Sequence, residues 1–150
     1  MLNVHYGHLV RILHWCTDQT MTDALEKMDL TAAQGRLMSF IFHKGQPVYP
    51  RDLETGLHLS HPTVSGLLSR MEQKGFVELQ VDPGDRRSRR ILVSPKGLAC
   101  HERMLAVIAE NENRIVDGFT PEEKEQFASF LQRAINNVCP ENGCQEKEEL

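Results

Sequence analysis

Hydrophobic residues in this chain recur mainly at intervals of three and four, the spacing of helices that bury one face. Helix-starting signals divide this pattern into segments. Thr31 with Gln34, and Thr120 with Glu123, have the spacing of capping boxes. Tyr49 precedes a proline suited to the first position of a short helix. The expected helices cover residues 2 to about 27, 31–45, a short segment from 49, 60–75, 95–117 and 120–138.

The helix expected over residues 60–75 has an unusual exposed face. Its apolar face contains Val64, Leu67, Leu68 and Met71. The opposite face is small and polar around Gly66, although glycine costs about 1 kcal/mol relative to alanine in a helix interior. Such a face can enter the major groove of DNA, and the alternative is that another helix packs against it. The residues expected to meet DNA are His61, Pro62, Thr63, Ser65, Gly66, Ser69 and Arg70.

A short hairpin is expected directly after this helix. Residues 76–81 alternate between apolar and polar, with Val77, Leu79 and Val81 on the buried side, and residues 90–93 form the return strand. The sequence of residues 82–85 suits a type II turn. Arginines follow it at the tip, where they can enter the minor groove: Arg86, Arg87 and Arg89, with Arg90 behind them. Helix and hairpin together predict a winged helix-turn-helix, and the alternative is a solvated hairpin.

The distribution of charge favours one basic face. The formal net charge is −4, yet residues 60–96 contain seven basic and four acidic residues, so this segment carries +3 and the remainder −7. An acidic remainder limits non-specific adsorption to nucleic acid. The pattern therefore favours a selective reader of double-stranded DNA.

From about residue 30 to residue 100, the sequence resembles the MarR (multiple antibiotic resistance regulator) family of transcription factors. Asp85 and Arg87 match the family's pairing at the tip of the wing, and we expect Asp85 to organise that tip. The other residues that carry the resemblance are Leu57, Leu59, Ser60, Pro62 to Ser65, Leu67, Leu68, Arg70 to Glu72, Lys74 to Val77, Asp82, Pro83, Arg86, Ser88, Leu92 and Gly97.

The resemblance implies a homodimer that binds a palindromic operator, usually represses, and releases DNA on binding small anionic or phenolic ligands, oxidants or metals. The residues expected to line an effector site are His8, Arg11, Ile12 and Trp15. Cys16 resembles the sensor of the hydroperoxide-responsive branch, so a thiol-responsive regulator is an alternative. His5 and His8 lie one helical turn apart, which leaves a metal-responsive regulator open, although no metal site is expected.

The terminal helices, residues 2–27 and 95–138, are more apolar than a small reading head can cover. We therefore expect them to bury each other across the two-fold axis of a dimer, and the alternative is a monomer in which they pack internally. Residues 1–139 are expected to form one domain with the DNA-reading head at about 31–96. Residues 140–150 form an acidic segment that is expected to be disordered.

Several other classes of protein are disfavoured. No phosphate loop, HExxH or GxSxG motif is present, so neither an enzyme nor a cofactor is expected. Cys139 and Cys144 are expected to be free thiols, although they could close a small loop or hold half of a metal site. No run of 18 apolar residues and no signal-peptide pattern is present, which predicts a cytoplasmic protein that does not enter a membrane.

The expected fold is therefore mainly α, a winged helix-turn-helix with a small antiparallel β-wing and terminal dimerisation helices. A winged-helix module that binds protein in place of DNA is the competing interpretation.

Overall fold

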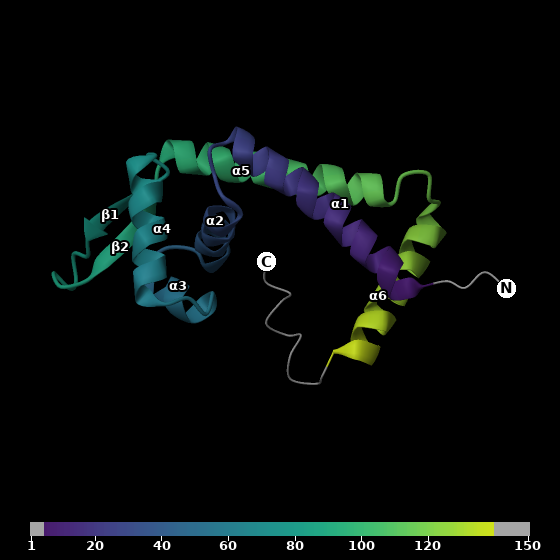
Figure 1. The fold of residues 1–150 in the computed structure, drawn as a ribbon. Coiled ribbons are helices and arrows are strands. Elements are labelled where there is room, and N and C mark those ends of the chain that lie inside the picture. The colour runs from purple at the N-terminus through teal and green to yellow at the C-terminus, as the bar shows by residue number, and fades with distance from the viewer. Residues whose placement is uncertain (1–4, 140–150) are drawn as a thin grey trace. The chain divides into compact units, whose positions relative to one another are not determined.

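A computed structural model describes residues 5–139 and confirms the mainly helical fold (Figure 1). The chain divides into two compact units, Met1–Ile108 and Ala109–Leu150. The described residues form six helices and a two-stranded antiparallel sheet: α1 (Tyr6–Lys27), α2 (Ala32–Lys44), α3 (Pro50–Gly56), α4 (His61–Gln73), β1 (Val77–Val81), β2 (Arg89–Val93), α5 (Pro95–Ile115) and α6 (Pro121–Val138). The expected acidic segment at 140–150 lies outside the described residues.

The helix-starting signals act as the sequence predicts. The Thr31 Oγ1 accepts from the N–H of Gln34 (3.2 Å), and the Gln34 side chain accepts from the N–H of Thr31 (3.0 Å). Thr120 and Glu123 form the same reciprocal pair at the start of α6. Gly75 follows α4 with a φ of +77°, the left-handed conformation that commonly ends a helix. These local bonds fix where the elements begin and end.

One hydrophobic core unites α2, α3, α4 and the hairpin. Leu53 of α3 is fully buried, and the N-terminal part of α5 closes the core with Cys100 and Met104. Each such side chain contributes roughly 1.5–3 kcal/mol through burial. The other members from α2, α4 and the hairpin are Leu37, Met38, Ile41, Val64, Leu68, Met71, Phe76, Val77 and Ile91.

The hairpin, or wing, leaves the core as it extends. Its register runs from Val77 opposite Val93 to Val81 opposite Arg89. Val77 is buried, but Val81 is 55% exposed, which corrects the prediction that it lies on the buried side. The strand has passed the edge of the core at that point.

The expected type II turn at 82–85 is also wrong. Such a turn requires a positive φ at its third residue, and Gly84 does not have one. The carboxylate of Asp82 bends the chain instead, because its Oδ1 accepts from the N–H groups of Gly84 (2.7 Å) and Asp85 (3.1 Å). A backbone bond from Ser88 N–H to Asp85 O (2.9 Å) then closes the tip.

Many apolar side chains of the terminal helices remain exposed. On α1 and the first part of α5 these are Tyr6, Leu9, Val10, Ile12, Trp15, Leu98, Leu105 and Ile108. In the second unit, α6 has no buried residue, and Phe119, Phe130, Ile135 and Val138 are exposed. Within residues 5–139, no helix combines the length and apolarity needed to cross a membrane.

Candidate nucleic-acid interface

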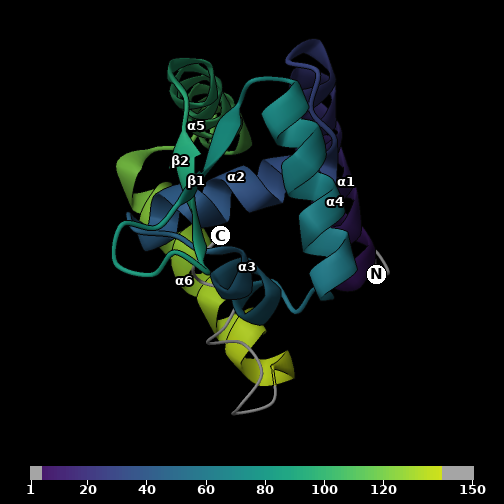
Figure 2. The ribbon, with the colours of Figure 1, turned by 90° about the vertical axis from the view of Figure 1, so that its left-hand side faces the viewer.

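The polar face of α4 is open. All seven residues of α4 that are expected to contact DNA are exposed, whereas Val64, Leu68 and Met71 on the other face are buried. A Cβ built on Gly66 would meet nothing within 4 Å, so no other helix within residues 5–139 packs against it. Helices α3 and α4 and the hairpin lie together in this part of the first unit (Figure 2). The small face is thus available to a partner outside the chain.

The first turn of α4 contains a histidine–carboxylate pair that the sequence did not predict. His61 donates from Nδ1 to Oε1 of Glu54 on α3 at 2.6 Å, while its side chain remains 75% exposed. The pair orients the imidazole and leaves its Nε2 free of this contact. Ser60 caps the same turn, accepting at Oγ from the N–H of Thr63 (3.4 Å).

Two lysines of the basic segment 60–96 make hydrogen bonds to other residues of the chain. Lys74, at the end of α4, donates from Nζ to the backbone O of Asp29 (2.7 Å) and to its Oδ1 (3.1 Å). Lys96 donates to the backbone O of Lys74 (2.6 Å) and lies over the ring of Phe76. These contacts tie the end of α4 to the α1–α2 connection and to α5. The ammonium groups of both lysines are therefore engaged in contacts within the chain.

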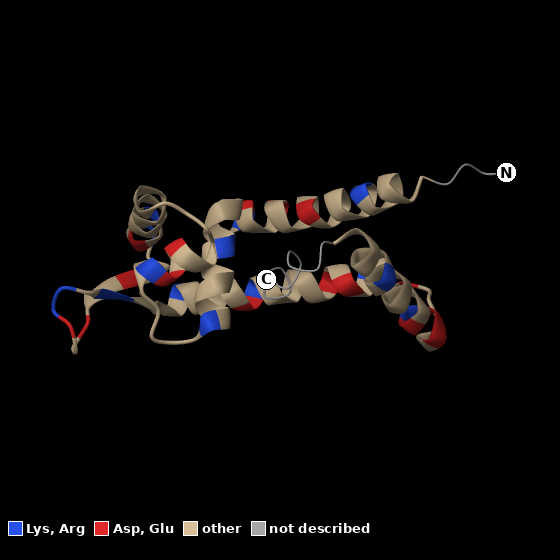
Figure 3. Cartoon of the chain, turned by 90° about the horizontal axis from the view of Figure 1, so that it is seen from below, with Lys and Arg blue, Asp and Glu red and all other residues tan. Residues whose placement is uncertain are grey.

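The tip of the wing presents three exposed arginines, Arg86, Arg87 and Arg89. Acidic and basic residues lie together at this tip (Figure 3). Asp85 accepts at Oδ1 from the backbone N–H of Arg87 (3.0 Å), so it shapes the turn through the main chain. The sequence allowed either this bond or a contact with the guanidinium of Arg87.

Asp82 connects the wing to the start of α3. Tyr49, at the start of α3, donates its hydroxyl to Oδ2 of Asp82 at 2.8 Å. This hydrogen bond lowers the pKa of Asp82 and raises that of Tyr49, because it favours the carboxylate and the neutral phenol. The two residues are 33 positions apart, so no local spacing could have revealed the bond.

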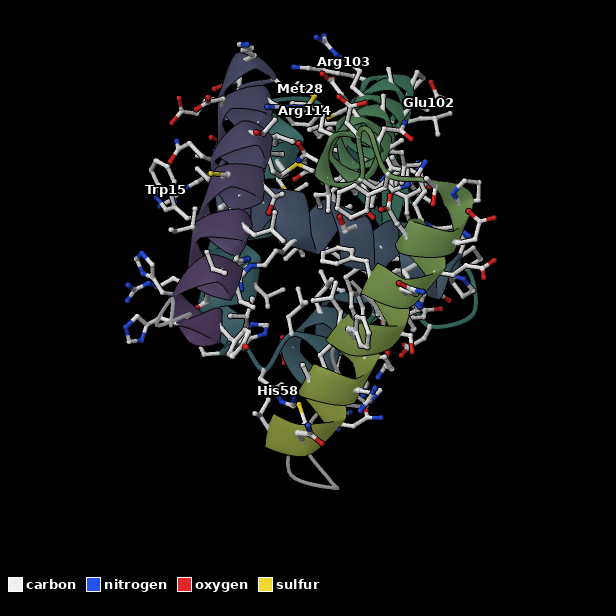
Figure 4. The ribbon with its side chains drawn as sticks, turned by 90° about the vertical axis from the view of Figure 1, so that its right-hand side faces the viewer. Trp15, Met28, His58, Glu102, Arg103 and Arg114 are labelled. Atoms are coloured by element: carbon white, nitrogen blue, oxygen red, sulfur yellow. The ribbon has the colours of Figure 1, made fainter. Side chains whose placement is uncertain are left out.

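The expected effector residues lie on α1 and are all exposed. Arg11 donates from Nη2 to Nδ1 of His8 at 2.9 Å, and both border a shallow concavity with His5. Ile12 is 45% exposed, and Trp15 points away from the rest of the first unit (Figure 4). Within one chain these side chains do not enclose a ligand.

The cysteines differ in their surroundings. Cys16 is exposed and free, whereas Cys100 is buried with its Sγ 3.6 Å from the Sδ of Met28, and this burial raises the pKa of its thiol. Cys139 is disulfide-bonded, which corrects the expectation of a free thiol there; Cys144 lies outside the described residues. Among residues 5–139, no three His, Cys, Asp or Glu side chains are grouped so as to hold a metal ion.

Comparisons with known proteins agree with this geometry. The sequence profile of the MarR family matches residues 28–88, which contain α2, α3, α4 and β1. The transcriptional regulator PecS of Dickeya dadantii is 28% identical over 123 residues, covering 81% of this chain and 74% of PecS.

Solved structures extend the likeness to most of the chain. MepR of Staphylococcus aureus bound to DNA is 27% identical, with a TM-score of 0.78 over 89% of this chain and 100% of MepR. MepR described as a transcription regulator of the multidrug efflux pump MepA has a TM-score of 0.80 at 26% identity, covering 91% of this chain and 100% of MepR. A putative MarR family regulator of Clostridium acetobutylicum has a TM-score of 0.76 at 25% identity, covering 89% of this chain and 98% of its own.

Proposed function

Because this chain belongs to the MarR family of winged-helix transcriptional regulators, which bind DNA and are not enzymes, we propose that it reads an operator with α4 and the wing. In this proposal α4 lies in the major groove, and the wing arginines lie in an adjacent minor groove. The arginines supply positive charge where the groove concentrates negative potential. His61 and Arg70 would contact bases or phosphates at the two ends of α4.

The observation that carries the proposal is the uncovered polar face of α4. A solvated helix gains nothing from glycine at its centre, and a packed one would have a neighbour there. Gly66 has no atom within 4 Å of a built Cβ, so its small size is explained by close approach of an external surface. The exposed arginines of the wing favour a polyanion as that surface.

We further propose that the protein acts as a homodimer on a pseudo-palindromic operator and represses transcription. The apolar side chains left exposed on α1, α5 and α6 support a second copy as their partner. A small anionic or aromatic effector would act near His8, Arg11, Ile12 and Trp15. Because these residues are exposed in one chain, the partner copy would complete the site.

The test uses double-stranded DNA selected by the purified protein from a random pool. Gly66→Glu should abolish binding of the selected DNA while the circular dichroism spectrum is unchanged, because it puts bulk and negative charge against the groove. Gly66→Ala is the matched control: it adds one methyl group and no charge, so it should weaken binding far less than Gly66→Glu. It should stabilise the protein by up to about 1 kcal/mol, since the site is open in the free chain.

A protein-interaction module predicts a different result. In that case the random pool would yield no enriched DNA sequence, and Gly66→Glu would change the oligomeric state or the binding of a protein partner. The DNA-reading assignment would then be wrong.

A further inference from the structure

The wing extends beyond the contacts that hold it to the core. The strand register ends at Val81 opposite Arg89, and both residues are exposed. A two-stranded ribbon has little stability of its own in water. The direction of the arginine-bearing tip therefore depends on the contacts that fix the wing to the helices beside it.

Two neighbouring residues before α3 make that connection. The backbone O of Val48 accepts from the N–H of Ile91 at 2.8 Å, and both side chains are fully buried. The hydroxyl of Tyr49 then contacts Asp82, where the tip of the wing begins. The first contact holds the base of the wing, and the second holds the residue at which the tip begins.

The two carboxylate oxygens of Asp82 contact different parts of the molecule, one the start of α3 and the other the tip of the wing. Its Oδ2 accepts from the hydroxyl of Tyr49, and its Oδ1 accepts from the N–H groups of Gly84 and Asp85. Its own N–H donates to Ser88 O at 2.9 Å on the returning side. A displacement of this one carboxylate would therefore move the whole tip.

Tyr49 is itself held firmly. Its N–H donates to Oδ2 of Asp52 at 2.8 Å, and Lys44 at the end of α2 pairs with the same oxygen at 2.6 Å. The phenol thus extends from a residue fixed to both α2 and α3. Motion of Tyr49 relative to α4 is limited, because α3 and α4 contribute Leu53 and Val64, respectively, to the same hydrophobic core.

We propose that Tyr49 is a positioning residue for DNA recognition, which aims the arginine tip of the wing through its hydrogen bond to Asp82. This inference rests on the proposed contact of the wing with DNA. Fixing the tip before binding lowers the ordering cost of inserting an arginine into a narrow groove. Tyr49 itself would not touch the DNA.

The variant that tests this is Tyr49→Phe, which keeps the ring and removes only the hydroxyl. The matched control is Tyr6→Phe at the only other tyrosine, which is 76% exposed on α1. Trypsin cleavage after the wing arginines measures the tip without DNA, because native-state cleavage reports local opening. Tyr49→Phe should speed this cleavage several-fold, and Tyr6→Phe should leave it unchanged.

DNA affinity gives the second measurement. Tyr49→Phe should weaken binding about three- to tenfold, the worth of a typical hydrogen bond, and should lower the thermal midpoint by no more than the loss of that one bond. In the background of Arg86→Ala, Arg87→Ala and Arg89→Ala combined, the same change should have no further effect, because no exposed arginine remains at the tip to be aimed. A purely structural role would weaken both backgrounds equally.

The outcomes separate the two proposals. Unchanged trypsin cleavage in Tyr49→Phe would overturn the positioning role whatever the DNA results. The positioning role would also be overturned if Tyr49→Phe reduced DNA affinity equally in both backgrounds, or if it caused no loss in the native background. If the arginine triple variant binds DNA as tightly as the native protein, the proposed wing contact fails, and faster cleavage would still establish the tether itself.

Discussion

Asp85 has opposite effects on DNA binding through its charge and through its hydrogen bond. Its carboxylate is exposed among the wing arginines, where a negative charge opposes the approach of phosphates. Its Oδ1 also accepts from the N–H of Arg87 at 3.0 Å, which fixes the backbone that presents that arginine. Two substitutions separate these effects.

Asp85→Ala should weaken binding by about 0.5–1.5 kcal/mol, because the turn loses its side-chain acceptor. Asp85→Asn keeps an oxygen acceptor and removes the charge, so it should bind at least as tightly as the native protein. Titrations of the selected DNA at fixed salt concentration measure both affinities. Tighter binding by Asp85→Ala would mean that the wing acts only through its net charge.

Among the helices and strands, the features predicted correctly are those determined by neighbours in sequence. The capping boxes at Thr31 and Thr120 and the exposed face around Gly66 depend on residues a few positions apart, and the structure contains all three. The site's long-range contacts could not be predicted in this way. The bonds from Tyr49 to Asp82 and from Lys74 to Asp29 span 33 and 45 residues, so they depend on how the elements pack.

The wing turn shows why a local pattern can mislead. Proline and glycine at 83 and 84 suit a type II turn, but the side chain of Asp82 supplies the acceptor and Gly84 keeps an ordinary φ. The inward residues of α5, Cys100 and Met104, were not predicted, because the sequence did not reveal which side of that helix the core would cover.

The packing of α5 on α2 makes stability depend on pH. His101 of α5 stacks on Phe42 of α2, with ring centroids 3.8 Å apart, and its Nδ1 is buried without a hydrogen-bond partner. Burial penalises the imidazolium and lowers the pKa of His101, although Glu102 acts in the opposite direction. The unfolded chain therefore takes up this proton more readily than the folded protein.

Stability should accordingly be fully present above the ordinary histidine pKa of about 6.5 and fall as the pH drops through the lower folded value. His101→Phe preserves a stacked ring and removes the titration, so its thermal midpoint should fall less between pH 7 and pH 5. His43→Phe, at an exposed histidine of α2, is the control and should retain the native dependence. Equal slopes for all three proteins would exclude His101 as a source of the acid sensitivity.

At the scale of the whole molecule, the exposed apolar residues need a partner. Exposed Phe130, Ile135 and Val138 leave α6 without a buried face in a single chain. Large apolar patches are uncommon on monomers and mark association surfaces. A two-fold dimer would bury them and carry two reading heads, each able to use α4 on one half of an operator.

Phe130→Glu should therefore shift the proposed dimer to a monomer in size-exclusion chromatography, because it places a charge on an exposed apolar side chain that dimerisation would remove from water. Gln132→Glu adds the same charge at an exposed polar position of α6 and should remain dimeric.

On DNA, the proposed dimer should select two inverted half-sites about 10 base pairs apart. Engaging both halves at once multiplies affinity by roughly 10²–10⁴ over one half, so Phe130→Glu should lose that factor on the full operator and bind a single half-site as the native protein does. Selection of one asymmetric half-site by a monomeric native protein would contradict the dimer. If Phe130→Glu instead lost the same factor of affinity on the half-site and on the full operator, its effect would lie in DNA contact and not in dimerisation.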